Sequence, residues 1–234
     1  MIIDKLKLMS GVPIAIQELG LSINQPKLKD IALMGEADFF KNISYFLVSK
    51  SKLNIPIEIS DFDLFMYFIN QDQSLQASIS DIFILIIDGI ESIKFYDSFI
   101  IINALGHECI IDEPKFLIIK ETLIQIFCLE SHGKTSDLNP ANKLAQEIAE
   151  KLRKRQERLS GMGSKQESSI FPDLISILSI GSNSLDIDAC LNLTVYQIYN
   201  LIKRFTMYQE HNRQIQALLQ GAKDIELTEW TKQL

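Results

Sequence analysis

Cysteine, tryptophan, arginine and long apolar runs are all scarce in this chain of 234 residues. The 3 Cys are widely spaced, which excludes a disulfide-stapled scaffold and is typical of reduced thiols in the cytoplasm. The longest apolar run, 82–87, falls far short of the roughly 20 residues that span a bilayer. Asp4, Lys5 and Lys7 interrupt the apolar start, so a secretory signal is not expected. The net charge of −7 excludes a surface built throughout to coat nucleic acid.

What the chain does contain is a large apolar fraction, 47%, which is enough to bury a core and excludes a mainly disordered chain. The chain has 37 Ile, and its basic residues are 18 Lys and 5 Arg. This skew indicates an AT-rich coding sequence and says little about chemistry.

Local signals in the N-terminal half predict several helices and one small sheet. Residues 1–25 contain Gly and Pro at short intervals and predict an extended arm. Residues 26–46 predict one bent helix or two short ones, because Gly35 interrupts the apolar spacing. Ser60 is a good N-cap for a helix over 61–70, and the next helix opens at Ser74 or Ser78. Short β-rich runs over 92–112 predict a hairpin or three-stranded antiparallel sheet, and Pro114 then opens a helix that reaches about Cys128.

The C-terminal half predicts helices on both sides of a linker. Asn139-Pro140 begins a charged helix over 139–160, and the Gly- and Ser-rich segment 161–169 is typical of a flexible linker. A helical C-terminal domain, 170–234, follows an α+β domain at 26–133 and that charged helix. Its long helix begins after Thr194 and ends before Gly221. One buried stripe is expected along it, made of Val195, Ile198, Ile202, Phe205, Ile215 and Leu219. The predicted fold class is α+β, predominantly α-helical.

Motifs for catalysis or cofactor binding are incomplete. Gly133-Lys134-Thr135 lacks the first glycine of a phosphate loop, and a helix rather than a strand precedes it, so a polar loop is the better interpretation. His107, Cys109, Cys128 and His132 have a spacing that zinc tolerates, but Cys109 and Cys128 fit better as small core residues. We expect no enzyme activity, cofactor or metal; a small hydrolase-like enzyme that uses His107 or His132 is kept as an alternative.

The sharpest charge feature is the basic stretch 143–158, which includes Lys151 and Arg155. Such a stretch can contact phosphates, which makes a nucleic-acid-associated adaptor a second alternative. Interleaved Glu residues four positions before basic partners also support an exposed helix that binds a protein or faces solvent. The second interpretation is preferred, and nucleic acid is not favoured as a partner.

Aromatic residues gather in the C-terminal third, where Tyr and Trp favour protein interfaces because they bury a large area at low entropic cost. The candidate partner-binding residues are Tyr196, Tyr199, Lys203, Arg204, Tyr208, Trp230, Lys151 and Arg155. The candidate surfaces are the arm 8–25 and the helix 194–220. Core packing is an equal alternative for Tyr199 and Phe205.

Three segments together carry a family resemblance. GVPIAIQELGLSINQPKLKDIALMGEADFF, NPANKLAQEIAEKLRKRQERL and LTVYQIYNLIKRF with LLQGAKDIELTEWTKQL resemble proteins from tail-morphogenesis clusters of tailed phages of low-GC Gram-positive bacteria. The resemblance implies a non-catalytic role in tail or baseplate assembly, as an assembly chaperone or a minor virion component. It implies other tail or baseplate proteins as partners, with self-association as an alternative and no membrane. The expected location is the host cytoplasm, with incorporation into a virion as the alternative.

Overall fold

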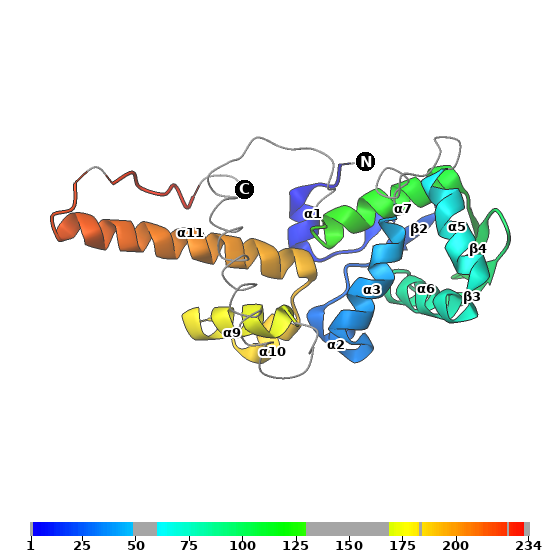
Figure 1. Cartoon of the computed structure of the whole chain (residues 1–234), viewed down its shortest axis with the longest axis horizontal. Helices are drawn as coiled ribbons and strands as arrows, with labels where there is room; N and C mark the ends of the chain where they lie inside the picture. The colour runs from blue at the N-terminus through cyan, green and yellow to red at the C-terminus, as the bar shows by residue number, and fades with distance from the viewer. Residues whose placement is uncertain (1, 49–59, 130–168, 183, 224, 232–234) are drawn as a thin grey trace. The chain divides into compact units, whose positions relative to one another are not determined.

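The computed structural model describes residues 2–48, 60–129, 169–182, 184–223 and 225–231 (Figure 1). The chain divides into two units, one of Met1–Leu129 with Phe171–Leu234 and one of Glu130–Ile170. The helices and strands labelled in Figure 1 belong to the first unit. The predicted helix 139–160 lies outside the described residues, and so does the linker 161–169 apart from its last residue.

The first unit is α+β and predominantly α-helical, which confirms the predicted fold class. Its N-terminal part runs α1 (Lys5–Ser10), β1 (Ile14–Ile16), β2 (Leu21–Ile23), α2 (Leu28–Met34), α3 (Glu36–Phe46), α5 (Asp61–Gln71), α6 (Gln73–Ile86), β3 (Ile90–Phe95), β4 (Ile100–Ala104), β5 (His107–Ile111) and α7 (Glu113–Ile126). Its C-terminal part runs α9 (Phe171–Gly181), α10 (Ile187–Leu191) and α11 (Val195–Leu219). Among the described residues, no helix has both the length and the apolar character needed to cross a membrane.

The segment predicted as an extended arm forms a short helix and a hairpin instead. Asp4 caps α1 by accepting a hydrogen bond from the Leu6 N–H, and Gly11 ends the helix in the left-handed conformation, φ 69°. β1 and β2 pair antiparallel, with both ends of each strand buried and the middle residue exposed. Strands of three residues are too short for their alternation to stand out in the sequence, so only their burial against the core reveals them.

Helix boundaries follow the local capping signals closely. The Ser60 hydroxyl accepts from the Asp63 N–H at 3.0 Å, and the Asp63 carboxylate accepts from the Ser60 N–H at 3.1 Å, a reciprocal cap at the predicted position. Gly35 has a φ of 94° and separates α2 from α3, which confirms the two-helix alternative. The cap of α6 is Asp72, not Ser74 or Ser78, because its carboxylate reaches the Ser74 N–H at 2.8 Å.

The predicted small sheet is present and has the order β3-β4-β5, with both pairs antiparallel. The β4–β5 turn is Leu105-Gly106, inside the segment 92–112 predicted to form the sheet. Ile100, Ile102 and Cys109 face the core, where α6 contacts β3 and α7 contacts β5. Alternation along these strands therefore separates a buried face from an exposed one.

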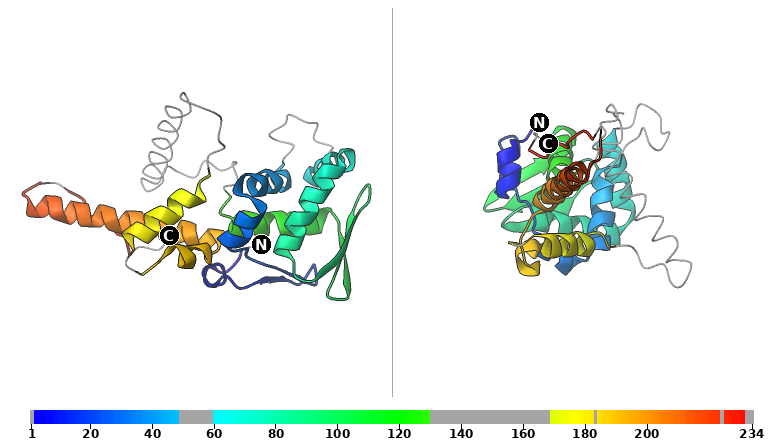
Figure 2. Two further views of the ribbon diagram at one scale, coloured as in Figure 1. Left: turned by 90° about the horizontal axis from the view of Figure 1, so that it is seen from below. Right: turned by 90° about the vertical axis from the view of Figure 1, so that its left-hand side faces the viewer.

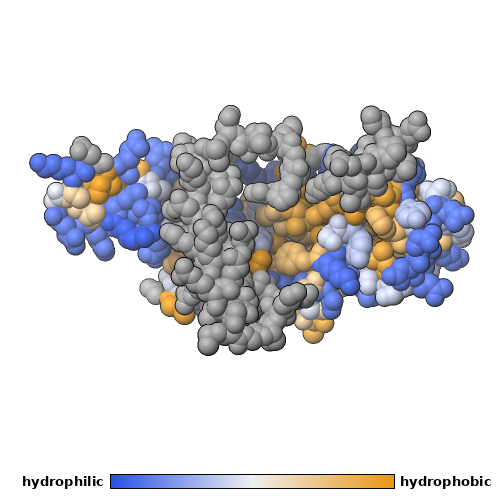
Figure 3. Space-filling model, viewed as in Figure 1, coloured by the Kyte–Doolittle hydropathy of each residue, from blue (hydrophilic) through white to orange (hydrophobic). Residues whose placement is uncertain are grey.

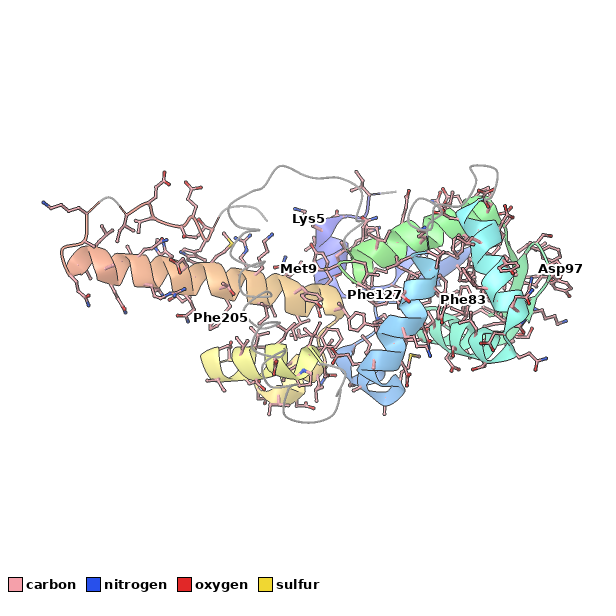
Figure 4. All side chains as sticks on the ribbon, in the orientation of Figure 1. Lys5, Met9, Phe83, Asp97, Phe127 and Phe205 are labelled. Carbon is pink, nitrogen blue, oxygen red and sulfur yellow. The ribbon has the colours of Figure 1, made fainter. Side chains whose placement is uncertain are left out.

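Buried phenylalanine rings form the centre of the core where α3, α5, α6 and α7 meet (Figures 1 and 4). The Phe46 ring lies 5.1 Å from Phe65, 5.5 Å from Phe83 and 6.2 Å from Phe116, centroid to centroid. Phe65 and Phe116 are closer still, at 4.6 Å. All four rings are at most 1% exposed. Such rings bury a large apolar area each and contribute further through their tilted and edge-to-face geometries.

A chain of aromatic contacts continues from this core to the C-terminal helices. Phe39 contacts Phe127 at 5.1 Å and Phe40 at 5.3 Å, and Phe40 contacts Phe171 of α9 at 5.6 Å. Phe171 in turn lies 6.3 Å from Tyr199 of α11. A backbone hydrogen bond also joins the two parts of the chain: the Leu28 N–H donates to the Leu193 carbonyl at 2.9 Å. Residues before 130 and after 170 therefore share one core.

Gly181 allows α9 and α11 to approach closely. A Cβ atom at this position would lie 2.2 Å from Cζ of Phe205, which is on the side of α11 that faces α9 (Figure 4). Carbon atoms that are not bonded to each other do not come so close, so a side chain here must displace the ring. Glycine is thus required by packing and not by its backbone angles.

We expect Gly181→Leu to lower the free energy of unfolding by about 1–3 kcal/mol, because the added side chain separates α9 from α11. Urea unfolding followed by circular dichroism measures the change. Ser176→Leu, on the exposed side of the same helix, is the matched control and should leave the free energy nearly unchanged. Equal stability of the two variants would contradict the close packing of Gly181 on Phe205.

Candidate protein interface on the C-terminal helix

The site begins with the cap that sets the start of α11. The Thr194 N–H donates to Oε1 of Gln197 at 2.8 Å, and the Gln197 N–H donates to the Thr194 hydroxyl at 3.3 Å. Gln197 also donates through Nε2 to the Met9 carbonyl at 2.7 Å, which attaches the helix start to the end of α1. The cap therefore sets which residues of α11 face the core.

Two different faces of α11 carry its apolar residues. Val195 and Ile198 are fully buried, and Ile202 and Phe205 are partly buried against the core. At 100° per residue, Tyr208 and Ile215 are turned roughly a fifth of a turn from Phe205, away from Ile198 and Ile202. Leu219 is 83% exposed. The prediction of one buried stripe from Val195 to Leu219 is wrong for Leu219, because the core ends before α11 does.

The C-terminal tail, residues 225–231, folds back along the second face of α11 (Figures 1 and 2). The Thr228 N–H donates to Oε1 of Gln214 at 2.6 Å, and the Thr228 carbonyl lies 2.9 Å from Nδ1 of His211. The Arg204 guanidinium donates to the Trp230 carbonyl. The Trp230 and Tyr208 rings meet edge to face, 5.2 Å apart. These contacts, which we call the tail clasp, are mostly polar and lie at the surface.

Around the tail clasp, several large apolar side chains face solvent. We call them the C-terminal row: Tyr208 is 42% exposed, Leu218 37%, Leu219 83%, Leu227 43% and Trp230 37%. Figure 3 shows apolar colour at the free end of α11 within a hydrophilic surround. Lys203 and Arg213 are exposed on the same helix. Exposed aromatic and leucine side chains gathered on one surface are typical of a protein-binding surface.

The structure separates the predicted partner-binding residues into two groups. Arg204, Tyr208 and Trp230 come together in the tail clasp. Tyr196 and Tyr199 pack against the core, near Cys128 at the end of α7. The described residues do not include Lys151 and Arg155, and these stay predictions.

Tyr199 lies at the junction between α11 and the core. Burial, together with the Cys128 thiol and the Glu36 carboxylate, raises the pKa of Tyr199 to about 12. Glu36 also accepts the Phe171 N–H at 3.2 Å, so its carboxylate is held at this junction. Lys203 is exposed and lies near the Cys128 thiol, where its charge acts against the effect of burial on the pKa of that thiol.

The residues considered for zinc or catalysis that the structure describes are His107, Cys109 and Cys128. Cys109 faces the core as predicted, and burial raises the pKa of its thiol. The prediction of a core residue is wrong for Cys128, which is exposed because it lies in the turn that follows α7. His107 is exposed and lines a groove of about 400 Å³ beside the β1–β2 hairpin. Within the described ranges, no three His, Cys, Asp or Glu side chains are placed to hold a metal ion. His132 and Gly133-Lys134-Thr135 lie outside those ranges.

Sequence reasoning missed the exposed isoleucines of α9 and α10. Ile177 is 45% exposed, Ile180 87% and Ile187 61%, whereas Ile175 and Leu178 of α9 are buried. The sequence of α9 has apolar residues on all sides, a pattern that indicates a helix covered on more than one face. The composition of α9 therefore does not distinguish its exposed side from its buried side.

We expect Arg204→Ala combined with Gln214→Ala to release the tail, because both changes remove hydrogen bonds of the tail clasp. Trp230 is the only tryptophan, so its fluorescence reports the tail alone. Its emission should shift to the red and its quenching by acrylamide should rise. Arg213→Ala is the matched control, since Arg213 pairs with Glu210 of the same helix. An unchanged spectrum in the double variant would contradict the tail clasp.

We expect the stability of the chain to fall between about pH 10 and 12, in part through Tyr199. The unfolded phenol loses its proton near its ordinary value of 10, whereas the folded one retains it to about 12. The folded state then binds more protons, and rising pH lowers the free energy of unfolding by at most about 3 kcal/mol. In Tyr199→Phe, the free energy of unfolding, measured with urea at about pH 10 and about pH 12, should fall less between the two pH values. Tyr67→Phe, at an exposed position, is the control and should leave this pH dependence unchanged. An equal pH dependence in the Tyr199→Phe variant and the unaltered chain would contradict burial of the Tyr199 phenol.

Comparison with protein-family models gives a match over the C-terminal third of the chain. Residues 164–234 match the family model described as the YomV second domain, a phage-derived family. No curated protein and no solved structure matches the chain. The matched segment contains α9, α10, α11 and the tail, and so includes the tail clasp and the C-terminal row. The C-terminal third of this chain is thus similar to a domain of phage origin.

Proposed function

We propose that this chain is a non-catalytic interaction protein of phage tail or baseplate assembly, either an assembly chaperone or a minor virion component. The observation that carries the proposal is the C-terminal row, a set of exposed Tyr, Trp and Leu side chains. It lies in the segment that matches a phage-derived domain family. The family match supports a phage origin, and the exposed row supports binding to another protein.

The physical argument for a protein partner rests on the cost of exposing apolar side chains. Leu219 is 83% exposed at the free end of a helix whose start is buried in the core. Burying such a side chain is favourable by about 25 cal/mol for each Å² of apolar surface removed from water. Tyr208 and Trp230 add aromatic area with low entropic cost, as hot-spot residues of interfaces do. Covering the C-terminal row with a partner is therefore favourable to the free energy of binding.

The tail clasp adds a reversible element to this surface. It consists of a few hydrogen bonds at or near the surface and one edge-to-face contact, each of which contributes on the order of 1–2 kcal/mol. A partner can therefore displace the tail at low cost and contact the face of α11 beneath it. Such reversibility suits a chaperone that must release its client, while a virion component stays bound.

Co-expression with the products of neighbouring genes tests the proposal. The tagged full chain should co-purify with a tail or baseplate protein in a defined ratio, read by native mass spectrometry. Leu218→Ser combined with Leu219→Ser should reduce the recovered partner at least about tenfold, because the interface loses its exposed leucines. Tyr67→Ser and Leu117→Ser are controls at exposed positions of α5 and α7, and should retain the partner.

Two outcomes would overturn the proposal. One is a chain that stays monomeric and co-purifies with none of these products. The other is a partner whose recovery is equal in the leucine variant and the controls. Presence of the chain in purified particles then separates the virion component from the chaperone, which is absent from them.

A further inference from the structure

A groove of about 740 Å³ lies between α2 and α6, away from the C-terminal row. The segment that connects β2 to α2, including Gln25 and Pro26, contributes to its lining. None of its lining residues belongs to α11 or the tail, so the groove is a surface separate from the proposed interface.

The two helices contribute the same arrangement of side chains. On α2, Asp30 is followed by Leu33 and Met34; on α6, Asp81 is followed by Ile84 and Leu85. Spacings of three and four residues place each carboxylate beside the apolar pair on one helix face. Leu33 is 90% exposed and Ile84 59% exposed. Two large apolar side chains thus face solvent on opposite sides of one groove, a pattern typical of a binding groove.

The groove is rimmed by negative charge. Asp30, Asp81 and Asp88 line it, and Lys27 is the only basic residue among the described residues of the lining. Two of the carboxylates are held in place: Asp88 accepts the Asn24 side-chain amide at 2.6 Å, and Asp30 accepts the Lys27 N–H at 3.0 Å. Fixed carboxylates around an apolar centre complement a segment with basic side chains around apolar ones.

Gln25 supplies a separate observation from the lining of the same groove. It is 6% exposed, and its Nε2 donates to the carbonyls of Lys7 at 2.9 Å and Val12 at 2.8 Å. Its Oε1 is the only buried side-chain oxygen or nitrogen without a partner in the described part of the chain. A buried acceptor without a donor is costly, so this atom calls for a bound group or an ordered water.

We propose that the groove binds a basic amphipathic segment of a partner protein. Apolar side chains of the segment insert between Leu33 and Ile84, and its Lys or Arg side chains pair with Asp30, Asp81 and Asp88. A second copy of this chain is an outcome of the test, because each copy also contains the basic stretch 143–158. The proposal is independent of the interface on α11, since it rests on other residues.

The test uses the full chain and a fluorescent peptide of roughly 14 residues with Leu on one helical face and Lys on the other. Fluorescence anisotropy should show saturable binding that weakens as the salt rises from about 50 to 300 mM. A peptide of the same length with Glu in place of Lys should not bind. Leu33→Ser with Ile84→Ser, and separately Asp81→Lys, should each weaken binding at least about tenfold.

Matched controls separate the groove from general attraction to an acidic protein. Asp97→Lys changes an exposed acid at the β3–β4 turn, and Leu117→Ser an exposed leucine of α7; both should bind as the unaltered chain does. The altered positions are exposed, and unchanged circular dichroism and melting temperature verify the fold. Equal loss in groove and control variants would overturn the proposal. So would equal binding of the Glu peptide, or a dimer by native mass that dissociates on Leu33→Ser, because a second copy is then the occupant.

Discussion

The packing of Phe46 against Phe65, Phe83 and Phe116 is the contact on which the rest of the structure depends. These rings come from four helices that are separated by as many as 70 residues, so the cluster sets the positions of α3, α5, α6 and α7 together. The sheet is placed as a consequence, because α6 contacts β3 and α7 contacts β5. Polar groups sit at the edge of this core, as in the ion pair of Lys120 with Asp61 at 2.8 Å. Close packing of these large rings gives one arrangement in which α3, α5, α6 and α7 bury them together.

The aromatic contacts that extend from this core explain why α11 has two different halves. Phe40, Phe171 and Tyr199 connect α3, α9 and α11, and Phe205 packs on Gly181 where no side chain would fit. Beyond Phe205 the core offers α11 no further surface. The second half of the helix is then covered only by the tail among the described residues, through Arg204, Gln214 and Thr228. An interface at the end of a helix that is anchored at its start is both exposed and held in a fixed orientation.

The molecule presents two surfaces of different chemistry. The C-terminal row carries aromatic and leucine side chains, whereas the groove between α2 and α6 carries leucine and isoleucine with carboxylates. The carboxylates of the groove favour a basic partner segment, because electrostatic complementarity selects the partner and accelerates its approach. Two proposed interfaces of different chemistry would let the chain hold two different partners during assembly. The similarity of residues 164–234 to a phage-derived domain covers the first surface only.

The sequence by itself determined the features that depend on neighbouring residues. Ser60 and Thr194 cap their helices where expected, and Gly35 separates two helices. The small sheet occupies the predicted segment except that β3 begins two residues earlier, at Ile90. Only the tertiary structure decided the β1–β2 hairpin, the face of α11 that meets the core, and the return of the tail to bring Trp230 onto Tyr208. Caps and turns are hydrogen bonds within a few residues, so the local sequence specifies them. Short strands and exposed helix faces instead take their positions from distant side chains, whose contacts no local pattern encodes.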